Sequence, residues 1–147
     1  DYVDELTDSA AICGAINCVT RIEDRLVGDN TIGRSLRRSL GEMIDLDGKQ
    51  VVLLGAGMVA RAIGLELAQC GVHSVTVVNR TEQHGRELVE LLQRDSEFEL
   101  RYDPWEGDYR IPSTTDLLIH ATSIGMGAPE MRIPVDLETL RPECLAA

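Results

Sequence analysis

Aromatic side chains and positive charges are both scarce in this chain of 147 residues. One Trp, three Tyr and one Phe make up 3% of it, so the core must be built from aliphatic side chains. No apolar run approaches the roughly 18 residues that a membrane-spanning helix needs, which argues against a membrane protein. The chain has 14 Lys and Arg but 25 Asp and Glu. Its net charge of −11 argues against a broad surface that binds nucleic acid.

The four cysteines, Cys13, Cys18, Cys70 and Cys144, form no CxxC pair and no spacing typical of zinc ligands. Because the chain shows no secretory signal, we expect reduced, mostly buried thiols in a cytoplasmic protein, and no metal site. The chain begins without Met and ends on an apolar segment that is typical of the approach to a strand. We therefore expect a piece of a longer protein.

The first part of the chain predicts a small unit of mixed structure. Its expected elements are a short helix or turn over residues 4–12 with capping groups in Thr7 to Ser9, a β-hairpin of residues 15–20 and 25–28, and a helix over residues 33–43. That last helix would carry Leu36, Leu40 and Met43 on one face. The polar turn at residues 45–48 separates a first predicted domain, residues 1–44, from a second, residues 45–147.

Strands and helices alternate in the second domain. The expected elements are strands at 51–54, 75–78, 97–101 and 116–121, helices at 58–70 and 81–94, a loop at 102–115 and a turn at 123–127. Gly71 and Thr81 are the expected C-cap and N-cap of these helices. The alternation predicts an α/β fold with a doubly wound parallel sheet, strand order 3-2-1-4, and one crossover that is mostly loop.

The sheet is expected to stop after its fourth strand, because the chain ends where a fifth would begin. The outer edge of residues 116–121 would then be unpaired, and such an edge recruits other chains. We therefore expect residues 14–29 to fold over this edge, or the chain to associate with itself.

A G-x-G-x-x-A pattern directly follows the first buried strand and opens a helix, the context in which this pattern binds dinucleotides. It consists of Gly55, Ala56, Gly57, Met58, Val59 and Ala60. Gly55 permits the tight turn, Gly57 lets the backbone approach a pyrophosphate, and Ala60 lets helix and strand pack closely. The free N–H groups of the helix N-terminus would face the phosphates. The alternative is a glycine turn without a ligand.

The end of the second strand indicates which dinucleotide is bound. NAD sites usually place Asp or Glu there, but this chain has Asn79, Arg80 and Thr81. A guanidinium is suited to bidentate phosphate binding, which favours NADP. The alternative is that Arg80 is only a solvated surface arginine.

Five segments together resemble the shikimate dehydrogenase family in order and spacing. They are residues 14–17, 28–31, 53–57 with Arg61 and Ala62, 79–81 and 121–126. The resemblance implies a Rossmann-type NADP domain preceded by the end of an α/β substrate domain. It implies NADPH-dependent reduction of 3-dehydroshikimate to shikimate, in aromatic amino-acid biosynthesis. The substrate would be a shikimate-like acid, with quinate or a related acid left open.

The resemblance also implies roles for individual residues. Asn17 would hydrogen-bond a substrate hydroxyl, unless it only satisfies backbone groups beside the hairpin. Asn79, Arg80 and Thr81 would clamp the adenosine 2′-phosphate. The loop beside the nicotinamide would consist of Thr122, Ser123, Ile124 and Met126, unless it is an ordinary strand-ending turn.

The chain departs from the family pattern at the groups that move protons. Ile32 stands where the family has an Asp, and the Lys that pairs with that Asp is absent. The only lysine, Lys49, precedes the first buried strand, at the end opposite to ligands. His120 replaces an Asn and could bond the cofactor or donate a proton, or be a satisfied polar residue. No catalytic pair is intact, and the alternative function is a non-catalytic NADP-binding module or a degenerate paralogue.

Overall fold

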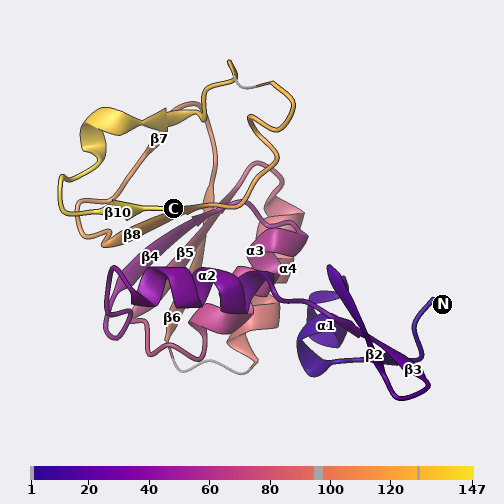
Figure 1. Ribbon diagram of the computed structural model, residues 1–147. Coiled ribbons are helices and arrows are strands. Elements are labelled where there is room, and N and C mark those ends of the chain that lie inside the picture. The colour runs from indigo at the N-terminus through magenta and orange to yellow at the C-terminus, as the bar shows by residue number, and fades with distance from the viewer. Residues whose placement is uncertain (1, 95–97, 129) are drawn as a thin grey trace.

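The computed structural model describes residues 2–94, 98–128 and 130–147, and consists of a small N-terminal unit beside a larger parallel sheet (Figure 1). The N-terminal unit comprises β1 (Glu5–Leu6), α1 (Asp8–Cys13), β2 (Cys18–Ile22) and β3 (Arg25–Asp29). Its strands are ordered β1-β3-β2, with β2 and β3 antiparallel. The expected hairpin and the capping role of Thr7, whose side chain accepts a hydrogen bond from the Ala10 N–H, are both confirmed.

The central sheet is parallel throughout, and its described strands are ordered β10-β8-β4-β5-β6. The strands are β4 (Gln50–Leu54), β5 (Ser74–Asn79), β6 (Glu99–Pro104), β8 (Leu117–His120) and β10 (Leu145–Ala146). Read from β6 to β8, this is the predicted order 3-2-1-4, so the doubly wound α/β fold is confirmed. The crossover from β6 to β8 contains no helix, as predicted.

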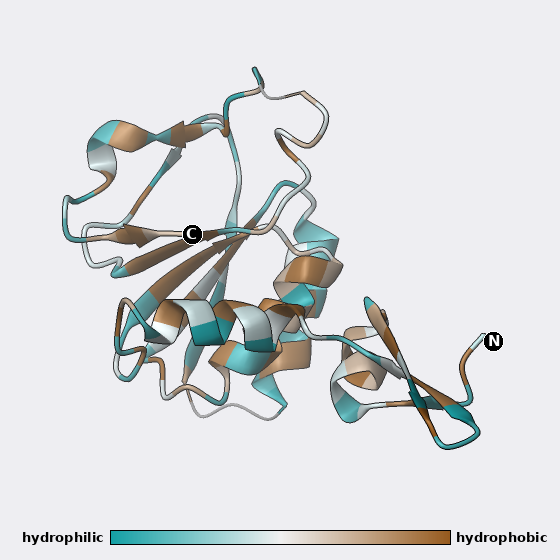
Figure 2. Ribbon diagram, viewed as in Figure 1, coloured by the Kyte–Doolittle hydropathy of each residue, from teal (hydrophilic) through white to brown (hydrophobic). Residues whose placement is uncertain are grey.

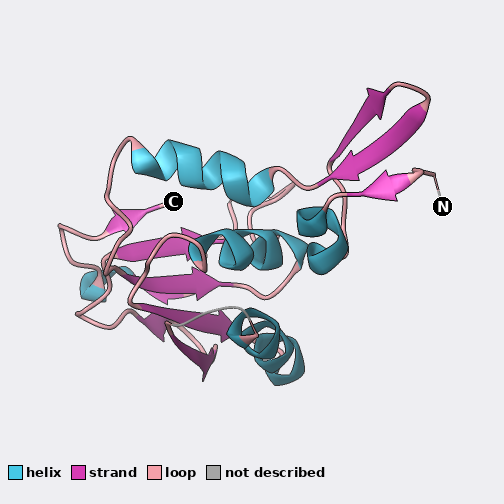
Figure 3. Cartoon of the chain, turned by 90° about the horizontal axis from the view of Figure 1, so that it is seen from below, coloured by secondary structure: helices cyan, strands magenta, loops and turns pink. Residues whose placement is uncertain are grey.

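The expectation that the sheet stops at its fourth strand is wrong. Leu145 and Ala146 pair in parallel with Leu117 and Leu118, and the His120 N–H donates to the Ala147 oxygen. The outer edge of β8 is therefore covered by a short fifth strand. Residues 14–29 do not cover it, because the hairpin pairs with β1 and projects away from the central sheet (Figure 3).

The two faces of the central sheet are covered differently, and Figure 2 shows that its strands are largely hydrophobic. On one face, α2 (Ile32–Gly41), α3 (Met58–Leu67) and α4 (Glu82–Gln93) pack on the alternate side chains of β4, β5 and β8. The other face, with Val52, Leu54 and Leu118, packs against irregular chain that includes Trp105 and Tyr109. This irregular part contains β7 (Tyr109–Arg110), β9 (Val135–Asp136) and the 3₁₀-helix η1 (Leu137–Thr139).

Several predicted helix and strand ends differ from those of the structure. Helix α2 ends at Gly41, so Met43 lies beyond it and is 68% exposed instead of sharing the buried face. Helix α3 ends at Leu67 with Ala68 as its C-cap, because the next N–H groups bond three residues back and tighten the last turn. Gly71, the expected C-cap, lies past this turn with φ +69°.

The predicted third strand and the loop after it are also redrawn. Pairing with β5 continues to Pro104, so β6 runs three residues past the predicted end. Proline is tolerated there because β6 is an edge strand. Within the predicted loop, β7 pairs in parallel with β9. Residue 97 of the predicted strand lies outside the described residues.

Candidate cofactor-binding site

A groove of about 450 Å³ opens at the carboxyl ends of β4, β5 and β8. This is where open parallel sheets bind their ligands. Three segments far apart in the sequence meet there. The predicted cofactor residues that line it are Gly55, Ala56, Gly57, Met58, Val59, Asn79, Arg80, Thr81, Thr122, Ser123, Ile124 and Met126. Ala60 does not line the groove but is fully buried in the helix-facing core.

The two glycines of the loop after β4 meet different surroundings. Gly55 has φ +110°, and a Cβ there would lie 2.6 Å from the Ala121 carbonyl oxygen. Its N–H donates to the Val78 carbonyl, so the turn is held against β5. Gly57 has an ordinary φ of −81°, and a Cβ there would meet no protein atom within 4 Å. Packing against other protein atoms therefore does not require glycine at position 57. Its missing side chain leaves space in the groove, as expected of a backbone that a pyrophosphate approaches.

Asn79, Arg80 and Thr81 follow the carboxyl end of β5. The Asn79 side-chain amide donates to the Thr81 carbonyl, and the Tyr102 hydroxyl donates to the Asn79 carbonyl at 3.0 Å. The Arg80 guanidinium makes no hydrogen bond or ion pair within the described ranges, so it is free to meet an anion. Thr81 occupies the predicted N-cap position of α4, but its hydroxyl makes no capping bond.

The loop after β8 is tied to the strand by a histidine and a threonine. The His120 Nε2 lies 2.6 Å from the Thr122 Oγ1, and this oxygen also accepts a hydrogen bond from the Ile124 N–H at 3.1 Å. Burial lowers the pKa of His120, which favours its neutral form. Gly125 has φ +88°, and Met126 is 80% exposed at the rim of the groove. His120 thus positions the predicted nicotinamide loop through Thr122.

Comparison with known proteins shows the family of this chain. The family model described as shikimate / quinate 5-dehydrogenase matches residues 36–126. The chain belongs to this family.

Individual relatives resemble the chain over nearly its whole length. A shikimate dehydrogenase (NADP(+)) of Desulfitobacterium hafniense is 39% identical over 98% of this chain and 51% of its own. The 5-ketofructose reductase of Gluconobacter sp. strain CHM43 is 39% identical, with a TM-score of 0.89 over 99% of this chain and 53% of that one. The Thermus thermophilus shikimate dehydrogenase, solved with NADP(H) and shikimate, is 32% identical with a TM-score of 0.78, over 99% of this chain and 51% of that one. The chain therefore spans about half the length of these relatives.

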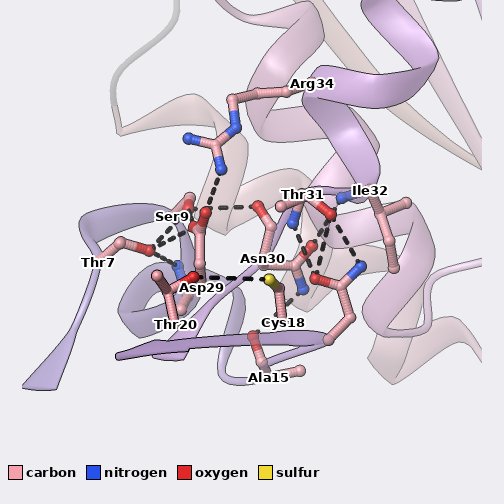
Figure 4. Close-up of polar contacts among 12 residues, drawn as sticks. Thr7, Ser9, Ala15, Cys18, Thr20, Asp29, Asn30, Thr31, Ile32 and Arg34 are labelled. Carbon is pink, nitrogen blue, oxygen red and sulfur yellow. Dashed lines mark hydrogen bonds and ion pairs between the residues drawn. The ribbon is translucent and has the colours of Figure 1, made fainter. Parts of the chain in front are cut away.

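Asn17, the predicted substrate residue of the family, lies outside the groove in the N-terminal unit. Its Oδ1 accepts a hydrogen bond from the Thr31 N–H at 2.9 Å, and its amide nitrogen donates to the Thr31 hydroxyl at 3.2 Å. Figure 4 shows Thr31 beside Ile32 at the start of α2, and Asp29 with Thr7, Ser9 and Arg34. Asn17 is thus exposed but already bonded to backbone and hydroxyl groups beside the hairpin.

The N-terminal unit touches the cofactor loop through helix α1. The Cys13 thiol is buried and donates to the Met58 carbonyl oxygen at 3.4 Å. Burial raises the pKa of this thiol, which favours the protonated donor. Helix α1 therefore lies against the N-terminus of α3, next to the groove.

Ile32 and Lys49 provide none of the family's proton chemistry in the groove. Ile32 packs against the helix-covered core as the first residue of α2. Lys49 lies just before β4, at the opposite end of the strand, where its carbonyl accepts a hydrogen bond from the His73 N–H. Neither residue lines the groove.

Three groove or support residues are not predicted from the sequence: His84, Tyr102 and Trp105. Trp105 and His84 line the groove, and the Trp105 indole N–H donates to the Pro134 carbonyl at 2.9 Å. Trp105 directly follows β6, so a correct end for that strand would have placed it at the carboxyl edge of the sheet. The sequence pattern places His84 on a helix surface, and the N-cap Thr81, which was predicted correctly, is the signal that would have placed His84 in the first turn of α4, near Arg80.

The described residues contain neither a metal-ligand cluster nor a membrane-spanning helix. No group of three or more His, Cys, Asp or Glu side chains among them could hold a metal ion. None of the helices they form has the length and apolarity to cross a membrane.

Proposed function

We propose that this chain binds NADP(H) in the groove described above, as the cofactor-binding part of a shikimate dehydrogenase-like oxidoreductase. The observation that carries the proposal is that the glycine loop, the Arg80 segment and the loop after β8 converge on one groove. The fit of the groove supports it further, since Gly57 leaves its ligand-facing side open and Arg80 has no protein partner among the described residues. The NADP names and complexes of the relatives agree with this choice of cofactor.

Each segment has a separate task in this proposal. The Gly57 backbone and the N-terminus of α3 would receive the pyrophosphate, because free N–H groups and the helix dipole favour anions there. Arg80, with Asn79 and Thr81, would hold the adenosine 2′-phosphate. The loop of Thr122 to Met126 would lie beside the nicotinamide. The bound nicotinamide would supply hydride transfer to or from an alcohol–ketone pair.

For the whole protein we propose the reduction of 3-dehydroshikimate to shikimate, with this shikimate-like acid contacted by Asn17. Bonding to Thr31 presents the Asn17 amide at a fixed position, and this amide keeps a second N–H for a ligand. We also propose that residues 1–44 belong to the substrate domain and residues 45–147 to the cofactor domain.

A second candidate function is a non-catalytic NADP-binding module or degenerate paralogue. It is favoured by Ile32, which packs into the core in place of a carboxylate, and by Lys49, which lies at the wrong end of β4. Ketone reduction needs a positioned proton donor, and these two residues leave that task unassigned. Binding of NADP(H) is common to both functions, and turnover separates them.

The test of the shared property uses Trp105, the only tryptophan of the chain, which lines the groove. Titration with NADPH should quench Trp105 fluorescence with a saturable, single-site curve, and NADP⁺ should reverse the effect by competition. Fluorescence that does not change, or that changes linearly without saturation, would contradict cofactor binding in this groove.

A further inference from the structure

We propose that Cys13 and Asn30 are positioning residues, through which an occupied cofactor groove acts on the side-chain amide of Asn17. The inference deepens the proposed function and rests on it, because it takes Asn17 as the substrate residue and the N-terminus of α3 as the pyrophosphate site. Cys13 is 2% exposed and Asn30 is 4% exposed. Both side chains are buried beside the contact of α1 with α3, and neither lines the groove itself.

The first link joins Cys13 to the peptide group between Met58 and Val59. The Cys13 thiol donates to the Met58 carbonyl oxygen at 3.4 Å. Helix α3 begins its hydrogen bonding with the Arg61 N–H, which donates to the Gly57 carbonyl, so the Val59 N–H is one of the free donors at this helix N-terminus. The Met58 carbonyl and the Val59 N–H belong to one planar peptide group. An anion that accepts from this N–H would therefore polarise the carbonyl and strengthen its bond with the thiol.

The second link joins Cys13 to the chain on both sides of the β2–β3 hairpin. The Asn30 side-chain amide donates to the Cys13 sulfur at 3.5 Å and to the Ala15 carbonyl at 3.2 Å. The Asn30 Oδ1 accepts a hydrogen bond from the Ile32 N–H at 3.2 Å. The contacts of Asn30 with Ala15 and Ile32 are drawn in Figure 4. Asn30 thus ties the end of α1, the segment before the hairpin and the start of α2 together.

Asn17 lies at the end of this series of contacts. Its backbone N–H donates to the Asp29 carbonyl at 3.0 Å, and its side-chain oxygen accepts from the Thr31 N–H at 2.9 Å. Asp29 and Thr31 are the sequence neighbours of Asn30, and Ala15 precedes Asn17 by two residues. A small movement of Asn30 therefore reaches Asn17 along both segments. Binding of the cofactor thereby adjusts the amide that is proposed to meet the substrate.

The test uses the asparagines of the chain, which are Asn17, Asn30 and Asn79. Labelling the side-chain amide of asparagine with nitrogen-15 makes these residues visible by NMR during a titration with NADPH. The Asn79 signal reports that the groove is occupied, because Asn79 lines it. In the unaltered chain, saturation with NADPH should shift the signals of the two remote asparagines, Asn17 and Asn30, together with that of Asn79.

Substitutions of Cys13 separate its hydrogen bond from its packing. Cys13→Ala and Cys13→Val both remove the thiol donor, and the valine also fills the space of the sulfur. Each variant should keep the Asn79 shift and lose the shifts of the two remote asparagines. Cys13→Ser retains a donor at this position and should retain those shifts.

Cys70→Ala is the matched control, because the Cys70 thiol donates at 3.1 Å to the Glu66 carbonyl, at the end of α3 away from the groove. This variant should respond to NADPH as the unaltered chain does. Shifts of the remote asparagines that are equal in Cys13→Val and the unaltered chain would overturn the inference and leave the proposed function standing. The same holds if only Asn79 responds in the unaltered chain. An Asn79 signal that NADPH leaves unchanged would instead remove the proposed function and the inference with it.

Discussion

Gly55 and Gly57 stand two residues apart in one loop, yet different physical requirements select glycine at each. At Gly55 the backbone itself demands it, since φ is +110° and the Ala121 carbonyl oxygen occupies the space of a Cβ. At Gly57 the backbone would accept any residue, and the surrounding space is open. The first glycine therefore serves the fold, whereas the second serves a ligand.

Alanine substitutions at these two positions should separate folding from binding. Gly57→Ala should change the free energy of unfolding by no more than about 1 kcal/mol, because only an N-cap preference is altered. It should nevertheless weaken NADPH binding at least about tenfold, since its methyl group enters the groove. Gly55→Ala should instead lose about 2–4 kcal/mol of stability through backbone strain and collision. Denaturant unfolding and NADPH titration measure the two effects, and normal NADPH affinity in Gly57→Ala would contradict this account.

At the scale of elements, the close crossing of α2 over α3 depends on Gly33. A Cβ at this position would run into the Ala62 carbonyl oxygen of α3. The close approach lets Ile32, Leu36 and Leu40 reach the core formed with the central sheet. Gly41, at the other end of the same helix, has open space around it.

Gly33→Ala should lower the free energy of unfolding by about 1–3 kcal/mol, because α2 must move off α3. Gly41→Ala is the matched control within the same helix and should raise stability by about 0.5–1 kcal/mol, since alanine loses less backbone entropy. Urea unfolding followed by circular dichroism compares the two. Equal effects of the two substitutions would show that α2 does not pack as described.

The longer elements could be predicted from the sequence, whereas the shortest and their partners could not. The apolar run of β4 and the helical spacing in α3 and α4 were sufficient signals. The two-residue strands β7, β9 and β10 carry no periodicity, and only tertiary contacts define them. The cofactor segments follow β4, β5 and β8 directly, so their convergence could be predicted. The predicted N-cap Thr81 also fixes the first turn of α4, which carries His84, but Trp105 depended on the exact end of β6.

At the scale of the whole molecule, the proposed cofactor residues and the proposed substrate residue lie in different units, which meet where α1 contacts α3. The groove belongs to the central sheet, and Asn17 to the N-terminal unit, with the Cys13 thiol bonding Met58 between them. The chain covers about half of its relatives. Self-association stays a prediction, but its proposed site at the edge of β8 is occupied by β10.

This chain should show no measurable oxidation of shikimate by NADP⁺, even at high protein concentration. Ile32 cannot exchange a proton, and loss of one acid–base group commonly costs about 10²- to 10⁴-fold in rate. The measurement is NADPH formation followed by absorbance. Turnover of about one per second that is abolished by His120→Ala would contradict this prediction. It would make His120 the proton donor, positioned only when cofactor and substrate are bound.

The central claim is that Arg80 receives the 2′-phosphate of NADP, and calorimetric titration of the unaltered chain and Arg80→Ala with NADP⁺ and NAD⁺ tests it most directly. Charge-assisted hydrogen bonding predicts a preference for NADP of roughly 10- to 150-fold that the variant loses. Long-range repulsion by the net charge of −11 is screened over about 8–10 Å and should not cancel it. Arg38→Ala is the control, because this exposed arginine of α2 lies outside the groove. Equal NADP⁺ and NAD⁺ affinities in the unaltered chain, or a preference that Arg80→Ala leaves unchanged, would contradict the account.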